Sequence, residues 1–358
     1  MRPQDQALRT IVDQHLFAPG ARLLVAVSGG ADSVALLHIL QRLPHPWRLS
    51  LRVGHIDHQL RRSSAEDAAF VEARGAHAGI PVTVARRDVA AVCRRHGWSL
   101  EDGARRIRYE ALREIAHTYS CSRIVLAHTA DDQAETVLLR LLRGTGLLGL
   151  SAMPYQRTVE EGREDLRIVR PLLDVWRQDL RAYLRHEGLR HREDPSNQDR
   201  RFLRNRIRHE LLPLLERRYN PKIRTLLAQL AEQSACDYAY LDAAASRQWK
   251  RTIRPDGEPT LPANRSLRNG HPPSGARPLA ISRERFLRQP KALQRQLFRR
   301  AIQTVEGAGA LAYRHWLQVE RLFRDQPVGT RLELPGGIQA RRELSRVVVS
   351  QPTPAPQR

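Results

Sequence analysis

The sequence contains few cysteines, few lysines and no long hydrophobic segment. Only three cysteines occur in 358 residues, and Cys93, Cys121 and Cys236 are far apart in sequence. This spacing excludes a disulfide scaffold, a CxxC redox pair and a zinc ribbon. No segment approaches the roughly 18 apolar residues of a membrane span, and the start, MRPQDQALRTIV, lacks the apolar core of a signal peptide. We therefore expect a cytoplasmic protein with no membrane partner.

Although lysine is scarce, the chain is strongly basic. Lysine and arginine together number 60 against 38 acidic residues, a formal net charge of +22, and all but three of the basic residues are arginine. The planar guanidinium group matches phosphate in a bidentate way, so nucleic acid is the first candidate partner. Such binding would weaken steeply with salt. A GC-rich genome could produce the same arginine enrichment without any nucleic-acid partner.

Strand-like and helix-like segments alternate along the first half of the chain. Segments with a strand pattern lie at 23–27, 49–53, 82–84 and 124–127. Segments with a helical apolar pattern lie at 34–40, 63–79, 99–119 and 131–143. This alternation predicts an α/β fold with a doubly wound parallel sheet.

The second half is predicted to be mainly helical. Helical patterns cover most of 166–220, which is rich in arginine, then 222–250 and 286–323, whereas 347–349 is strand-like. The length suggests about two domains. We expect a first domain over 1–220 with a helical C-terminal extension and a second, smaller, mainly α domain over 221–350. We expect an exposed loop at 251–279 within this second domain and a disordered tail at 351–358 after it.

A glycine-rich turn separates the first predicted strand from its helix. It places backbone N–H groups, hydroxyls and a helix N-terminus around one point, and that combination binds phosphate. An aspartate among such groups is well suited to Mg²⁺. The residues of the turn are Ser28, Gly29, Gly30, Ala31, Asp32 and Ser33.

Other phosphate or nucleophile motifs do not fit this turn. A Walker A loop ends in Gly-Lys-Ser/Thr, and no lysine is present here; GxGxxG and GxSxG are also absent. The remaining alternative is an ordinary strand-to-helix turn with Asp32 and Ser33 in its first helical turn.

An acidic cluster follows the last predicted strand of the first half. On a helix Asp131, Asp132 and Glu135 lie three or four positions apart and project from one face. Like charges so close repel one another, so a cation such as Mg²⁺ bound to ATP would stabilise them. The alternative is structural, because Thr129 and Asp132 have capping-box spacing and acids are favourable at a helix N-terminus.

The turn at 28–33 resembles the signature of the N-type ATP pyrophosphatases, or PP-loop enzymes, whose fold is adenine-nucleotide α-hydrolase-like. These enzymes cleave ATP between its α- and β-phosphates and adenylate a carbonyl oxygen. Further motifs at family order and spacing make residues 20–220 similar to the tRNA(Ile)-lysidine synthetases, and 285–349 resembles their next domain more weakly. These motifs are 55–61 (HIDHQLR), 101–109 (EDGARRIRY), 194–197 (DPSN), 204–208 (RNRIR) and 211–213 (LLP).

The resemblance implies a two-step ligation that uses ATP and Mg²⁺. ATP would adenylate the 2-keto oxygen of the wobble cytidine in an isoleucine tRNA with a CAU anticodon, and free L-lysine would then displace AMP to give lysidine. Two rivals remain open: another PP-loop tRNA-modifying enzyme, a thiolase, and a PP-loop small-molecule synthetase of the GMP or NAD type. The thiolating relatives pass sulfur through cysteines, and this chain offers no obvious pair.

The resemblance also assigns roles to residues. The turn from Ser28 to Ser33 would bind ATP, and Asp32, Asp132 and Glu135 would be catalytic, with Asp32 and Asp132 near Mg²⁺. The smaller domain would help bind tRNA, and a homodimer is left open. Predicted tRNA- or substrate-binding residues are Arg105, Arg108, Asn197, Arg204, Asn205 and Arg208. Independently of the family, Arg204 and Arg208 share one helical face and would make a phosphate clamp.

Overall fold

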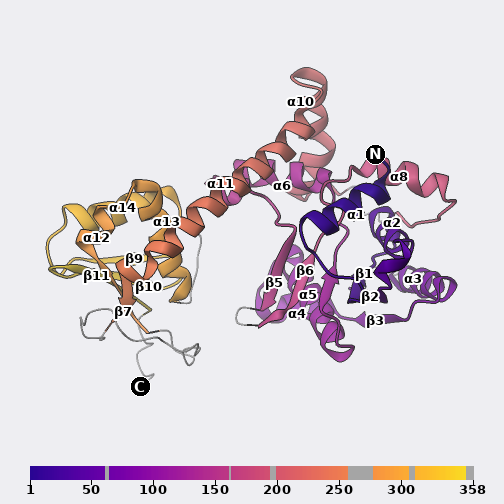
Figure 1. Cartoon of the computed structure of the whole chain (residues 1–358), viewed down its shortest axis with the longest axis horizontal. Helices are drawn as coiled ribbons and strands as arrows, with labels where there is room; N and C mark the ends of the chain where they lie inside the picture. Colours follow the sequence, from indigo (N-terminus) through magenta and orange to yellow (C-terminus); the bar gives the residue numbers. More distant parts are fainter. Residues whose placement is uncertain (61–63, 161–162, 194–198, 257–276, 306–310, 352–358) are drawn as a thin grey trace. The chain divides into compact units, whose positions relative to one another are not determined.

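The chain forms two compact units, Met1–Ala235 and Cys236–Arg358 (Figure 1). The computed structural model describes residues 1–60, 64–160, 163–193, 199–256, 277–305 and 311–351. Helix α11 (Ile223–Thr252) carries the chain from the first unit into the second. The domain limits predicted from the sequence, 1–220 and 221–350, stay a prediction.

The first unit is built on a six-stranded sheet with the order β3-β2-β1-β4-β6-β5. All neighbouring strands run parallel except β5, which pairs antiparallel with β6. The strands are β1 (Arg22–Ala26), β2 (Ser50–Asp57), β3 (Val82–Arg86), β4 (Arg123–Val125), β5 (Gln156–Glu160) and β6 (Arg163–Val169). The helices are α1 (Pro3–Asp13), α2 (Ala31–Gln41), α3 (Ser64–Ala78), α4 (Val89–His96), α5 (Leu100–Thr118), α6 (Ala130–Leu142), α7 (Leu147–Leu150), α8 (Arg177–His186), α9 (Leu203–Arg206) and α10 (Leu212–Arg218).

Helices cover both faces of this sheet, as expected for a doubly wound fold. Successive strand residues point to opposite faces, so Leu23 and Val25 pack with α1, α2 and α8. Leu24 points the other way and packs with Leu112 and Ile115 of α5. The apolar segment of β1 is continuous because both of its faces are buried. The predicted fold class is confirmed for this unit.

Two strands of the sheet, β5 and β6, were not predicted from the sequence. Residues 166–220 were expected to be mostly helical, but 166–169 belong to β6, which pairs with β4 and extends the sheet. Leu166, Ile168 and Val169 are buried. A short apolar segment cannot be assigned to strand or helix from periodicity alone, and its pairing with β4 decides the outcome. Strand β5 then adds an antiparallel edge.

The second unit combines helices with a five-stranded antiparallel sheet of order β7-β8-β11-β10-β9. Among its strands the sequence had indicated only 347–349. The predicted helical region 286–323 contains three helices, and Phe286, Phe298 and Phe323 lie in their shared core. The elements are β7 (Ile253–Pro255), β8 (Leu279–Ser282), β9 (Arg331–Leu334), β10 (Ile338–Arg342), β11 (Arg346–Ser350), α12 (Arg283–Leu287), α13 (Lys291–Thr304) and α14 (Tyr313–Arg324).

Two predicted irregular segments fall largely outside the described residues. The expected loop at 251–279 is described only at its ends, where the chain forms the end of α11, β7 and the start of β8. The expected tail at 351–358 is described only at residue 351.

Candidate functional site

The candidate site lies where the strand order of the first sheet reverses. Strand β1 is followed in space by β2 and β3 on one side and by β4 on the other. Ligands of open α/β sheets bind outside the carboxyl ends of the strands at such a switch point. The glycine-rich turn follows β1, and helix α6 with its acidic residues follows β4, so the topology brings the two predicted motifs to the same edge.

The turn after β1 has the conformation that an anion-binding loop needs. Gly29 has a φ of +89°, a left-handed conformation that favours glycine. Gly30 is the N-cap of α2, and among the described residues no side chain caps this helix end. The free N–H groups and the helix dipole therefore remain available to a phosphate. The Ser33 hydroxyl donates to the Gly30 carbonyl at 2.8 Å and lies 3.3 Å from the Ser28 hydroxyl.

The capping box predicted at the start of α6 is present. The Thr129 hydroxyl accepts from the Asp132 backbone N–H at 3.4 Å, and Asp132 Oδ2 accepts from the Thr129 backbone N–H at 2.9 Å. The structural role and the proposed catalytic role of Asp132 are therefore compatible, because capping uses Oδ2 and leaves Oδ1 facing other partners. Glu135, one turn later, is fully buried.

Three arginines surround the two buried carboxylates of α6. Asp132 Oδ1 accepts from Arg177 at 3.0 Å, Arg204 at 3.0 Å and Arg208 at 3.3 Å. Glu135 accepts from the same three guanidinium groups, at 3.3, 3.0 and 2.6 Å. Burial alone would raise the pKa of Asp132, but the positive charges, chiefly Arg177 and Arg204, hold it well below its usual range. Asp132 is therefore ionised and held by ion pairs.

Arg177 also joins this cluster to the glycine-rich turn. It is the first residue of α8, and its Nε donates to Asp32 Oδ2 at 3.1 Å. The guanidinium thus contacts Asp32, Asp132 and Glu135 at once. Burial opposes the charged form of Arg177, yet the three carboxylates raise its pKa above the ordinary value. One side chain therefore connects the residues that follow β1 with those that follow β4.

Asp32 retains one oxygen suited to a cation. Its Oδ1 is buried and has no hydrogen-bond partner among the described residues. Burial raises the pKa of Asp32 despite the neighbouring Arg177. A buried carboxylate oxygen without a partner costs free energy that a hard cation would offset. Asp32 therefore fits the predicted Mg²⁺, whereas both oxygens of Asp132 already accept hydrogen bonds from protein groups.

The third acidic residue, Asp131, makes separate contacts. Its Oδ2 accepts from the backbone N–H of Arg177 at 2.8 Å, and its Oδ1 accepts from Arg224 at 3.3 Å. Asp131 thus fixes the start of α8, which places the Arg177 side chain. These contacts support the interpretation of Asp131 as a structural residue.

The structure places the predicted tRNA- or substrate-binding residues in three groups. Arg204 and Arg208 face Asp132 and Glu135. Arg208 lies in a π-helical turn (Ile207–Leu211) between α9 and α10, and such turns are frequent at functional sites. Asn205 is buried and donates to the Asp199 carbonyl at 2.9 Å. Arg105 and Arg108 are exposed on α5. Asn197 lies outside the described residues.

The central residue of the cluster, Arg177, is not among the site residues predicted from the sequence. Neither is Arg170, which is 2% exposed and donates from Nε to His128 Nδ1 at 3.2 Å. Both follow β6, the strand that was not predicted. Recognition of β6 as a fifth parallel strand would have indicated them, because residues that follow such a strand reach the same edge of the sheet.

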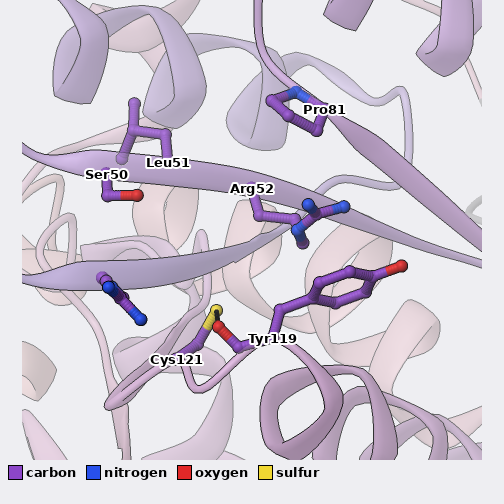
Figure 2. Close-up of a pocket in the computed structure, with 7 residues that line it drawn as sticks. Ser50, Leu51, Arg52, Pro81, Tyr119 and Cys121 are labelled. Carbon is purple, nitrogen blue, oxygen red and sulfur yellow. Dashed lines mark hydrogen bonds between the residues drawn. The ribbon is translucent and has the colours of Figure 1, made fainter.

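Arginine side chains lie between the carboxylates of the site. A cavity of about 330 Å³ lies at the opposite edge of the sheet, where β1, β2 and β3 begin. There Arg52 lies over the ring of Tyr119, 3.4 Å from its centroid (Figure 2). Its lining is Arg22, Ser50, Leu51, Arg52, Pro81, Tyr119 and Cys121, and none of the predicted site residues belongs to it.

The described part of the chain contains neither a grouped metal site nor a membrane-spanning helix. No three histidine, cysteine or acidic side chains in it are grouped as a metal site. None of its helices has the length and hydrophobicity that crossing a membrane requires.

Comparison with known proteins identifies relatives over nearly the whole chain. Residues 3–215 match the model of the PP-loop domain. A tRNA(Ile)-lysidine synthase from Geobacter sulfurreducens is 38% identical over 357 residues, covering 98% of this chain and 70% of the relative. One from a Nostoc species is 36% identical over 300 residues, covering 83% and 82%. One from Deinococcus radiodurans is 45% identical over 231 residues, covering 64% and 36%.

A solved structure also shares the fold. A U34-tRNA thiolase from Methanococcus maripaludis aligns with a TM-score of 0.53, covering 64% of this chain and 77% of the thiolase. The two are 13% identical, so this likeness shows the fold alone.

Proposed function

The chain belongs to the tRNA(Ile)-lysidine synthase family, ligases with an ATP-using PP-loop domain, and on this premise we propose that it ligates free L-lysine to the wobble cytidine of isoleucine tRNA with a CAU anticodon. The observation that carries the proposal is the meeting of the glycine-rich turn with Asp132 and Glu135 at one sheet edge, joined by Arg177.

The first step would activate the base. The cytidine 2-keto oxygen attacks the α-phosphorus of ATP, the bond to the β-phosphate breaks, and diphosphate leaves. The N–H groups at the start of α2 would hold the phosphates. Mg²⁺ held by Asp32 would neutralise phosphate charge. Arg177, Arg204 and Arg208 would contribute fixed positive charge where negative charge develops, a preorganised form of stabilisation.

The second step would transfer lysine. The ε-amine attacks the C2 carbon of the adenylated cytidine, the bond from C2 to the AMP oxygen breaks, and the amine loses a proton. Asp132 and Glu135 would position the amine, in exchange for part of their contact with the three guanidinium groups. Neither step requires a covalent enzyme intermediate, so positioning and electrostatics are sufficient.

A labelling experiment tests this function. The protein is incubated with ATP, labelled lysine and isoleucine tRNA bearing CAU, with the same tRNA carrying U at the wobble position as the matched control. We expect label in the first RNA and none in the second. Absence of label from both, in protein that binds the tRNA, would contradict the proposal.

The two rivals make different predictions. A thiolase would require a sulfur-carrying cysteine, so the triple variant Cys93→Ala, Cys121→Ser, Cys236→Ser should lose activity if that rival holds and keep it under our proposal. A small-molecule synthetase should release diphosphate from ATP without RNA, whereas we expect RNA-dependent release. A cytoplasmic location and a homodimer stay predictions.

A further inference from the structure

A second group of arginines lies beside the carboxylate cluster, and its positive charge is not balanced. Arg105, Arg108 and Arg157 lie around the ring of Tyr109, with guanidinium carbons 5.2, 5.9 and 4.9 Å from the ring centroid. Burial raises the pKa of Tyr109, but the charges of Arg105, Arg108 and Arg170 lower it below its ordinary value, so Arg170 also acts on this tyrosine. We call Tyr109 and these four arginines the Tyr109 cluster.

The Tyr109 cluster lacks the ion pairs that neutralise the neighbouring site. Arg177, Arg204 and Arg208 are matched by Asp32, Asp132 and Glu135. By contrast, none of the four arginines around Tyr109 has an ion pair with a carboxylate among the described residues. Like charges gathered in this way repel one another, and contacts with an aromatic ring offset only part of that cost. The cluster is therefore prepared for an anion from outside the described chain.

The arrangement of the sheet places this cluster on the side of the site away from the glycine-rich turn. Along the carboxyl edge the order is β1, β4, β6 and β5. The ATP-binding turn follows β1, the acidic helix follows β4, Arg170 follows β6, and Arg157 lies in β5. Neighbouring strands are about 4.8 Å apart, so Arg170 starts roughly 10 Å from the turn. A triphosphate held at the turn would leave the Tyr109 cluster free.

The cluster is also connected to the reacting centre. Arg170 donates from Nε to His128 Nδ1 at 3.2 Å and from Nη1 to the Pro154 carbonyl at 2.7 Å, so its guanidinium is fixed. Burial first, and then the charges of Arg170, Arg108 and Arg204, lower the pKa of His128 to about 3. His128 therefore stays neutral and adds no further positive charge beside Arg170.

We propose that the Tyr109 cluster binds the phosphodiester backbone of the RNA substrate beside the reacting base, with Arg157 as a phosphate contact that the sequence motifs do not indicate. The buried Arg170 contributes fixed positive charge to the cluster and does not itself contact the phosphate. This inference rests on the proposed function, which supplies an RNA substrate. Guanidinium groups already lie against the tyrosine ring, so Tyr109 organises the arginines and is not a surface on which a base stacks. The cluster positions the nucleotide and carries no base specificity.

The test compares two charge-matched variants. Arg157→Gln removes a cluster guanidinium that is half-buried, and Arg22→Gln removes an arginine at the opposite sheet edge that also has no ion pair among the described residues. Both lower the net charge by one. The dissociation constant for isoleucine tRNA is measured at several salt concentrations, together with the KM values for tRNA and ATP.

We expect Arg157→Gln to flatten the log–log salt dependence by about 0.7, the value for one lost contact to single-stranded RNA. The KM for tRNA should rise while the KM for ATP stays constant, and Arg22→Gln should match the wild type. Equal slopes for the two variants would overturn the proposal, because the effect would then reflect net charge alone. Arg105→Gln, an exposed position in the cluster, repeats the test if Arg157→Gln is unstable.

The binding measurement also separates this inference from the proposed function. If the wild type transfers no lysine but only the cluster variants flatten the salt dependence, the RNA contact stands and the reaction is wrong. If lysine is transferred and the slopes are equal, the reaction stands and the Tyr109 cluster is not a phosphate site.

Discussion

Replacing Arg177 by glutamine should cost more stability than any exposed arginine in the first unit. Its guanidinium contacts Asp32, Asp132 and Glu135 and is only 17% exposed. Without it, Asp32 loses its ion-pair partner, whereas Asp132 and Glu135 keep Arg204 and Arg208. Removing one member of a buried ion pair costs about 3–5 kcal/mol because the other charge is left uncompensated.

This cost should be visible as a change in melting temperature. For a unit of this size, 1 kcal/mol corresponds to roughly 2–4 °C, so the expected fall is on the order of 10 °C. Thermal unfolding is followed by circular dichroism for the wild type, Arg177→Gln, and the matched control Arg9→Gln. Arg9 pairs with Asp13 at 3.3 Å, and their side chains are 69% and 55% exposed. Exposed pairs contribute about 0.2–1 kcal/mol.

The comparison can refute the reasoning. If Arg177→Gln melts no lower than Arg9→Gln, the three-carboxylate contact does not stabilise the fold. Arg177→Lys should fall between the wild type and Arg177→Gln, because a single ammonium keeps the charge but cannot hydrogen-bond to three carboxylates in a fixed fork.

Three further predictions follow from the same site. Asp32→Asn should abolish AMP formation and leave tRNA binding nearly unchanged. The substitution removes the charge of Asp32, which of the two predicted metal ligands is the one with a buried oxygen that lacks a hydrogen-bond partner among the described residues. Turnover at the wild-type rate would contradict the metal role. His128 has a native pKa of about 3 against 6.5 for an ordinary histidine, so unfolding takes up a proton between these values. The stability that neutral His128 contributes is complete above pH 6.5 and is lost as the pH falls toward 3. Denaturant titrations from pH 7 to 4 should therefore show a shallower decline in the free energy of unfolding for His128→Gln than for the wild type. An identical decline would show that His128 is not neutral in the fold. Thr129→Val should lower the free energy of unfolding by about 1–2 kcal/mol through loss of the N-cap of α6, while Thr129→Ser should retain most of it; equal losses in both variants would assign the effect to packing.

The sequence determined the local motifs of the site. Ser28 to Ser33 after a buried apolar strand, and Thr129 to Glu135 at a helix start, are patterns of neighbouring residues, and their conformations follow from glycine, capping and helix spacing. The alternation of strands and helices also indicated the parallel sheet that brings both motifs to one edge.

Only the tertiary structure decided which charges meet. Arg170 and Arg177 follow β6, whose short apolar segment is equally compatible with a helix. Only the pairing of β6 with β4 places these arginines beside His128 and Asp132. Contacts separated by 42–76 positions leave no periodic signal in a single sequence. Packing sets the burial of each arginine and its nearest carboxylate. Arg204 and Arg208 therefore form ion pairs, whereas Arg105 and Arg157 have none among the described residues.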